Sequence, residues 1–105
     1  MKTYNKLIRD KIPQVMDSKG VTYSIRELDD QEYVEKLNEK LQEELDEYLM
    51  ADQEDQVEEL ADLVELVYAI LDNKCVSVEE FEKVRLKKRE ERGGFEKKLF
   101  LLSTE

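Results

Sequence analysis

The sequence contains no histidine and only one cysteine, Cys75, among its 105 residues. Without histidine, the Ser-His and Cys-His nucleophile systems are excluded, and the Glu-x-x-His motif of ferritin-like carboxylate bundles is missing. The same absence argues against a zinc site, and a single cysteine excludes a disulfide within the chain. Any general base must therefore be a carboxylate or a metal-bound hydroxide.

Long hydrophobic runs and phosphate-binding glycine loops are also missing. The longest uninterrupted apolar run covers residues 66–71, which is far too short to span a bilayer. The N-terminus has no apolar core of a secretory signal, and the chain has no Gly-Lys-[Ser/Thr] sequence of the P-loop type. We therefore expect a cytoplasmic protein that has no membrane partner and does not use a P-loop mechanism.

Charge is what the sequence has in abundance. Charged residues make up 42% of the chain, apolar residues make up 40%, and the net charge is −10. Residues 27–62 carry sixteen acidic and two basic side chains, whereas residues 1–26 carry six basic and two acidic ones, and residues 83–98 eight basic and three acidic ones. An acidic middle between basic ends indicates a site that needs both a cation and an anion. The small basic patches of an acidic protein argue against nucleic-acid binding.

The spacing of apolar residues predicts a mostly helical single domain, residues 1–105. Beyond Asp62 one predicted helix is apolar nearly all round, which predicts burial in the core or against a second chain. We expect a short helix near 10–19 capped by Asp10, and then a strand at 21–26. A long helix from Asp29 or Asp30 to about 51 is followed by a polar turn at 52–55 and by a second long helix at 56–73. The last expected elements are a helix at 78–92 opened by a Ser77 capping box and an extended segment at 95–102 that could pair with 21–26. The expected fold class is all-α, an antiparallel bundle of three to four helices with a minor two-stranded β element.

Two acidic motifs lie on the two central helices, Glu43-Glu44-x-x-Glu47 and Glu58-Glu59-x-x-Asp62. Because positions i and i+3 share one side of a helix, Glu44 faces the same way as Glu47, and Glu59 the same way as Asp62. In an antiparallel pair these four carboxylates point at one spot, where like charges gather only if they are protonated or a cation neutralises them. Oxygen ligands suit Mg²⁺, so the pattern predicts a magnesium site that holds a polyphosphate. The alternative interpretation is a pair of solvated acidic helices.

Basic residues at both ends of the chain are candidate phosphate ligands. Lys6, Arg9 and Lys11 lie around the first predicted helix, and Lys88 and Arg92 form an i, i+4 pair on the last one. Lysine and arginine are natural phosphate ligands, arginine through its bidentate fork. The alternative for each of them is ordinary surface pairing with nearby acids.

The two acidic motifs resemble those of the MazG-like all-α nucleoside triphosphate pyrophosphohydrolases. The ends of the chain resemble a subgroup of short proteins in this superfamily, through the segments YNKLIRDKIP and RGGFEKKLFLL. The superfamily includes phosphoribosyl-ATP pyrophosphohydrolase. The resemblance implies a homodimer or homotetramer. It also implies magnesium ligation by Glu44, Glu47, Glu59 and Asp62, a catalytic role for Glu43 and Glu44 in orienting or activating water, and phosphate binding by Lys88 and Arg92. Only eleven residues separate Glu47 from Glu59, a tight connection for this family.

These observations predict Mg²⁺-dependent hydrolysis of nucleoside triphosphates to the monophosphate and pyrophosphate, in the role of removing unwanted nucleotides. Two alternatives stay open. One is a related pyrophosphohydrolase that acts on phosphoribosyl-ATP, and the other is a non-enzymatic acidic helical module that binds a partner protein through residues 63–71.

Overall fold

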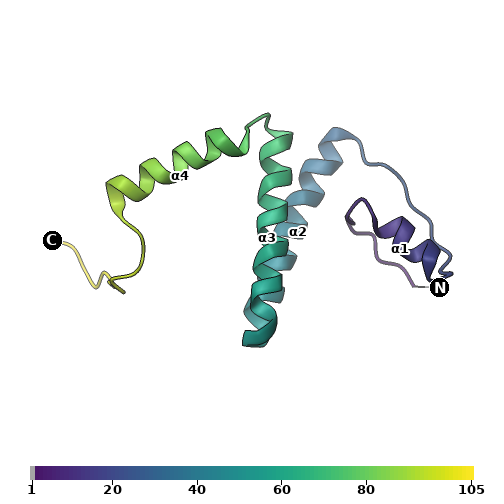
Figure 1. Cartoon of the computed structure of the whole chain (residues 1–105), viewed down its shortest axis with the longest axis horizontal. Helices are drawn as coiled ribbons and strands as arrows, with labels where there is room; N and C mark the ends of the chain where they lie inside the picture. The colour runs from purple at the N-terminus through teal and green to yellow at the C-terminus, as the bar shows by residue number, and fades with distance from the viewer. Residues whose placement is uncertain (1) are drawn as a thin grey trace.

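The computed structural model describes residues 2–105, which form four α-helices joined by loops (Figure 1). The helices are α1 (Ile12–Ser18), α2 (Asp30–Met50), α3 (Gln53–Asn73) and α4 (Val78–Arg92). No β-strand occurs among the described residues. The predicted all-α class is therefore confirmed, and the two central helices lie where the apolar periodicity predicted them.

Helices α2 and α3 pack side by side and run antiparallel (Figure 1). Their contact buries Leu37 of α2, which is 3% exposed, and Leu66 of α3, which is 8% exposed. Near the turn, the side-chain amide of Gln56 donates a hydrogen bond to the backbone carbonyl of Tyr48 at 3.3 Å. These contacts fix the register between the two helices, and this register decides which of their acidic side chains meet.

The connection between α2 and α3 is only two residues long, Ala51 and Asp52. The predicted polar turn at 52–55 was too long, because α3 begins at Gln53. Asp52 is extended, and its carbonyl accepts the N–H groups of Asp55 and Gln56. Acidic residues in a first helical turn interact favourably with the positive end of the helix dipole, so this acidic segment continues the helix rather than breaking it.

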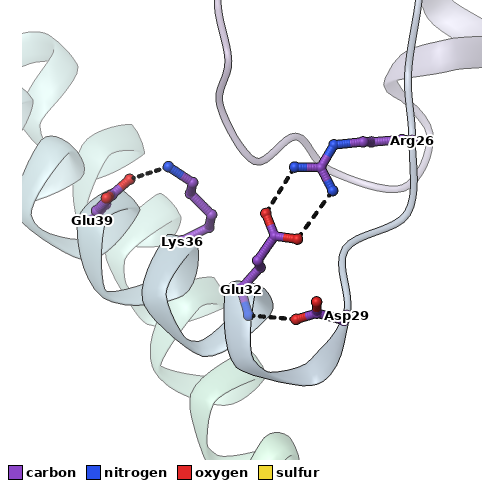
Figure 2. A network of polar contacts seen from close by, with 5 residues as sticks. All are labelled: Arg26, Asp29, Glu32, Lys36 and Glu39. Carbon is purple, nitrogen blue, oxygen red and sulfur yellow. Dashed lines mark hydrogen bonds and ion pairs between the residues drawn. The ribbon is translucent and has the colours of Figure 1, made fainter.

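Side-chain caps fix the starts of α2 and α4 as predicted. The Asp29 carboxylate accepts the backbone N–H of Glu32 at 2.8 Å, and the Ser77 hydroxyl accepts that of Glu80 at 3.1 Å. Figure 2 shows the first cap together with two neighbouring ion pairs. Arg26 donates two hydrogen bonds to Glu32, at 2.7 and 3.2 Å, and Lys36 donates one to Glu39 at 3.0 Å.

The predicted two-stranded β element was wrong. Residues 21–26 and 95–102 form no strand, and they lie at opposite ends of the molecule (Figure 1). A strand needs a partner for its backbone N–H and C=O groups, and neither segment has one here. Residues 95–98 form a turn instead, in which the Lys98 N–H bonds to the Phe95 carbonyl at 3.2 Å.

The predicted Asp10 cap of α1 was also wrong. The residue at the capping position is Lys11, whose side chain makes no capping hydrogen bond. Asp10 precedes the cap by one residue, outside the position from which a side chain accepts the first helical N–H groups. The rest of the prediction for this helix is confirmed, because Pro13 lies in its first turn.

The chain is extended for its length. Its radius of gyration is 18.1 Å, whereas a compact domain of this size has about 13 Å. Helix α4 leaves the end of α3 and projects away from the α2–α3 pair (Figure 1). The apolar half of α3 is only partly covered, since Val64 is 45% and Tyr68 41% exposed. None of the helices within residues 2–105 combines the length and hydrophobicity that crossing a bilayer requires.

Candidate metal centre

The four predicted metal ligands lie on the facing helices α2 and α3, where two overlapping groups of carboxylates meet. One oxygen each of Glu44, Glu59 and Asp62 lie within 4.8 Å of one another. Oxygens of Glu43, Glu44 and Glu47 form a second group of the same dimension. Glu44 belongs to both groups, so it is the centre of the arrangement. The predicted convergence of acids from two helices is therefore present in the structure.

Burial makes this cluster different from a solvated acidic surface. Glu44 is only 7% exposed, and both its Oε2 atom and the Oε2 atom of Glu59 are buried without a hydrogen-bond partner. An ionised carboxylate in such a place is unfavourable unless a cation or a proton compensates it. The interpretation of the motifs as a purely solvated face does not account for these two oxygen atoms.

The same geometry shifts the pKa values of two of these acids. Burial raises the pKa of Glu44, and the neighbouring Glu47 carboxyl raises it further, while Lys40 opposes the shift. Burial also raises the pKa of Glu59, and the charges of Asp62 and Glu44 add to this effect. All the donor atoms are carboxylate oxygens, the ligand type that Mg²⁺ and other hard cations prefer. The residues present thus fit a divalent cation.

Two cations of the chain already contact the first group of acids. The Arg9 guanidinium lies 2.6 Å from an Asp62 oxygen, and the Lys40 ammonium lies 3.4 Å from a Glu44 oxygen. Arg9 was predicted to bind phosphate, yet in this structure it pairs with a predicted metal ligand. Lys40 was not predicted as a site residue, although its position four residues before Glu44 is the spacing of a helical ion pair.

A cavity of about 430 Å³ opens beside the acids, between the N-terminal segment and the α2–α3 pair. It has an apolar part and a charged part, which is the usual composition of a small-molecule site. Its walls come from three places in the chain: Leu7, Ile8, Arg9, Asp10 and Lys11 before α1, Tyr33, Leu37, Lys40 and Glu44 on α2, and Asp62, Glu65, Leu66 and Ala69 on α3. Volumes of this order accept a nucleotide-sized ligand.

The other predicted phosphate ligands divide between the two ends of the molecule. Lys11 lines the same cavity as Arg9, and Lys6 lines a neighbouring cavity of about 330 Å³ together with Lys40 and Glu43. In contrast, Lys88 and Arg92 are exposed on α4, which points away from the acids (Figure 1). One chain therefore does not bring these two residues to the carboxylates, and their phosphate-binding role stays a prediction.

A sequence model of a protein family described as phosphoribosyl-ATP pyrophosphohydrolase matches residues 1–89. The chain belongs to the phosphoribosyl-ATP pyrophosphohydrolase family. The match includes all five acids of the centre and Lys88 but ends before Arg92. No curated protein and no solved structure matched the chain.

Membership of this family agrees with the MazG-like, all-α resemblance at the level of the superfamily. It indicates a pyrophosphohydrolase enzyme rather than a non-enzymatic module that binds a partner protein. The finer assignment to a subgroup of short proteins stays a prediction, because the segment RGGFEKKLFLL lies outside the matched residues.

Proposed function

We propose that this protein is a Mg²⁺-dependent pyrophosphohydrolase that acts on phosphoribosyl-ATP. Water attacks the α-phosphorus, the bond between this phosphorus and the oxygen bridging to the β-phosphate breaks, and the products are a monophosphate and pyrophosphate. The observation that carries the proposal is the buried Glu44 carboxylate with its unpartnered oxygen, at the centre of acids from two helices. The family supports the choice of reaction.

Each acidic residue has a distinct part in this proposal. Glu44, Glu47, Glu59 and Asp62 would hold Mg²⁺, which supplies charge neutralisation and activation of water when it is bound. Glu43 lies within the second group of carboxylates and on the wall of a cavity, where it can accept a proton from the attacking water. Glu44 belongs to the group with Glu43 and Glu47 and also to the group with Glu59 and Asp62, so it would link the proton acceptor Glu43 to the metal ligands of α3.

The basic residues near the cavity would bind the phosphate chain. Arg9 and Lys11 line the cavity beside the acids, and Lys6 lines the neighbouring one. Their positive charges would offset the charge that develops on the leaving pyrophosphate. In this proposal Arg9 and Lys11 share one cavity with Glu44 and Asp62, which agrees with the need for both a cation and an anion that the charge pattern of the sequence indicates.

The family description favours phosphoribosyl-ATP over ordinary nucleoside triphosphates as the substrate. Nucleoside triphosphates are the second candidate, because both kinds of molecule present the same triphosphate to the acids. The two differ in the phosphoribosyl group, whose additional phosphate needs a further cation. The cytoplasmic location expected from the sequence is part of this proposal.

The test is a substrate panel with the full-length protein. Pyrophosphate release is measured with phosphoribosyl-ATP, ATP and other nucleoside triphosphates, with and without Mg²⁺. Glu59→Gln and Asp62→Asn are expected to abolish release and leave the helical circular dichroism signal intact. Glu35→Gln, which changes an exposed acid of α2 that lines neither cavity, serves as the control. A Mg²⁺-dependent wild type that tolerates both changes would eliminate the proposed site.

We also propose that the protein is a homodimer, or a tetramer built from such dimers. Val57, Leu60, Val64 and Tyr68 recur at spacings of three and four on α3, and each is 41–73% exposed. The accessible surface of the chain is 9895 Å², compared with roughly 6,200 Å² for a compact monomer of this mass. A second copy is the occupant that covers the same stripe on both partners at once.

Association also offers a way to bring Lys88 and Arg92 of one copy toward the acids of another. Val64→Asp places a charge in the exposed apolar stripe and is expected to yield monomers in light scattering. A wild type that is monomeric at all concentrations would refute this part of the proposal.

A further inference from the structure

The Glu44–Glu59–Asp62 group is held in place by positive side chains of the chain itself. Arg9 contacts Asp62 at 2.6 Å, and Lys40 contacts Glu44 at 3.4 Å. Both basic side chains and both carboxylates line the 430 Å³ cavity. The same space is where the proposed function requires the metal and the phosphate chain.

The two cations compensate the acids only in part. The remaining oxygen of Glu44, Oε2, is buried and has no partner, and the Oε2 atom of Glu59 is in the same condition. Glu44 is 7% exposed, so water does not solvate this oxygen. Two cations therefore face three carboxylates, and one negative charge of the group has no counter-ion within the chain, although Arg9 and Lys40 contact one oxygen each of Asp62 and Glu44.

Lys40 and Arg9 differ in how they are held. Lys40 is fixed on α2, one turn before Glu44, and its side chain is 17% exposed. Arg9 comes from the segment before α1 and is about half exposed, so it can turn between partners at little cost. Both residues line the cavity, so each side chain lies next to the space where the proposed function puts the phosphate chain.

We infer that Arg9 and Lys40 are internal counter-ions, which hold Asp62 and Glu44 in the free protein and pass to the substrate phosphates when a divalent cation binds these carboxylates. This inference rests on the proposed function. This role accounts for the contacts of two positive side chains with the carboxylates that are proposed to bind the metal. It also assigns Lys40 a role in positioning Glu44 and then in binding substrate.

The inference predicts opposite effects on metal binding and on substrate binding. Arg9→Gln and Lys40→Gln each remove a cation that competes with Mg²⁺ for a carboxylate. Mg²⁺ binding without substrate, measured by isothermal titration calorimetry, is expected to become about 2- to 5-fold tighter in the Arg9 variant, the range that the energies of exposed ion pairs correspond to. The effect is expected to be at least as large in the Lys40 variant, because the pair with Glu44 is mostly buried. The KM for pyrophosphate release is expected to rise by roughly tenfold or more, since a charged hydrogen bond to phosphate is lost.

A matched control comes from an ion pair in Figure 2 that lies outside both cavities. Arg26→Gln removes an arginine that is paired with the Glu32 carboxylate at 2.7 Å. This change is not expected to alter the affinity for Mg²⁺ or KM by as much as 2-fold. If Arg26→Gln tightened Mg²⁺ binding as much as Arg9→Gln and Lys40→Gln, the effect would be one of overall charge, and the specific role would be refuted.

Conservative variants separate charge from structure. Arg9→Lys and Lys40→Arg keep the positive charge and are expected to restore the wild-type affinity for Mg²⁺. Suppose that the wild type binds Mg²⁺ and releases pyrophosphate. Mg²⁺ binding that is unchanged or weaker in both glutamine variants would then overturn this inference and leave the proposed function standing. A wild type that binds no Mg²⁺ would overturn the proposed function, and this inference with it.

Discussion

Replacing Glu44 by glutamine is expected to make the metal-free protein more stable while preventing it from binding Mg²⁺. Glutamine has the same shape as glutamate but carries no charge. The substitution therefore removes a buried negative charge that faces Glu47 and Glu59, both of which lie close enough to interact with it. The Lys40 ammonium, which lies 3.4 Å from a Glu44 oxygen, can still donate a hydrogen bond to the side-chain oxygen of the glutamine at this position.

The expected gain follows from the balance of these terms. Relieving an incompletely compensated charge contributes about 1–3 kcal/mol, and weakening the ion pair with Lys40 costs about 0.5–1 kcal/mol. The difference between these ranges is about 0–2.5 kcal/mol, and a net stabilisation near its middle, about 1 kcal/mol, is expected without metal. Saturating Mg²⁺ has the opposite effect, because a ligand present at 100 times its dissociation constant stabilises the wild type by about 2.7 kcal/mol. The Glu44→Gln variant binds Mg²⁺ poorly and gains little of this stabilisation. At saturating Mg²⁺ the wild type is therefore expected to be more stable than the variant.

Urea unfolding followed by circular dichroism measures both states at one protein concentration. With a slope of about 1–2 kcal/mol per molar urea, the metal-free midpoint should rise by roughly 0.5–1 M. Glu39→Gln, which alters an exposed ion pair with Lys36 on the same helix (Figure 2), should shift stability by less than about 0.5 kcal/mol with or without Mg²⁺. A metal-free Glu44→Gln variant that is less stable than the wild type by 1 kcal/mol would refute the reasoning, since the carboxylate would then be fully compensated.

The remaining predictions concern pH, packing and capping. The folded protein raises the pKa of Glu44 above its ordinary value of 4.5, so the folded state binds this proton more tightly than the unfolded chain does. The free energy of unfolding of the metal-free protein should therefore fall as pH rises from about 4.5 through the raised pKa. A contribution of Glu44 that rises with pH over this range would contradict the prediction. Leu37→Ala removes the most buried apolar side chain and should lower the free energy of unfolding by about 2–5 kcal/mol in urea titrations, whereas a loss under 1 kcal/mol would mean that the contact is not part of the core. Ser77→Ala should destabilise the start of α4 by about 1 kcal/mol and speed hydrogen exchange at the Glu80 amide, and unchanged exchange there would show that the cap is dispensable.

Local chemistry made much of the fold predictable. The Asp29 and Ser77 caps are determined by residues within one helical turn, so the starts of α2 and α4 follow from the sequence. The convergence of the acids follows from two motifs at i, i+3 spacing on helices that a short connection forces to be antiparallel. The burial of one carboxylate rather than its neighbours depends on the register of the two helices, which the motifs alone do not determine.

The errors arose where structure depends on distant partners. Residues 21–26 alternate as a strand does, but strand formation requires a second strand, and 95–102 lies at the far end of the molecule. The contact between Arg9 and Asp62 spans 53 positions of the chain and has no local signal. Lys40 did have one, because its spacing to Glu44 is that of a helical ion pair, but this spacing recurs along any charge-rich helix and does not by itself identify a site residue.

The two-residue connection at Ala51 and Asp52 has a consequence for folding. All five acids of the candidate centre belong to residues 43–62, a single hairpin closed by a very short loop. Closing such a loop costs little chain entropy, and contacts between neighbouring segments form quickly. The ligands can therefore come together early in folding, before the contacts of α4 form, and a divalent cation bound to them would stabilise the hairpin on which the rest of the chain folds.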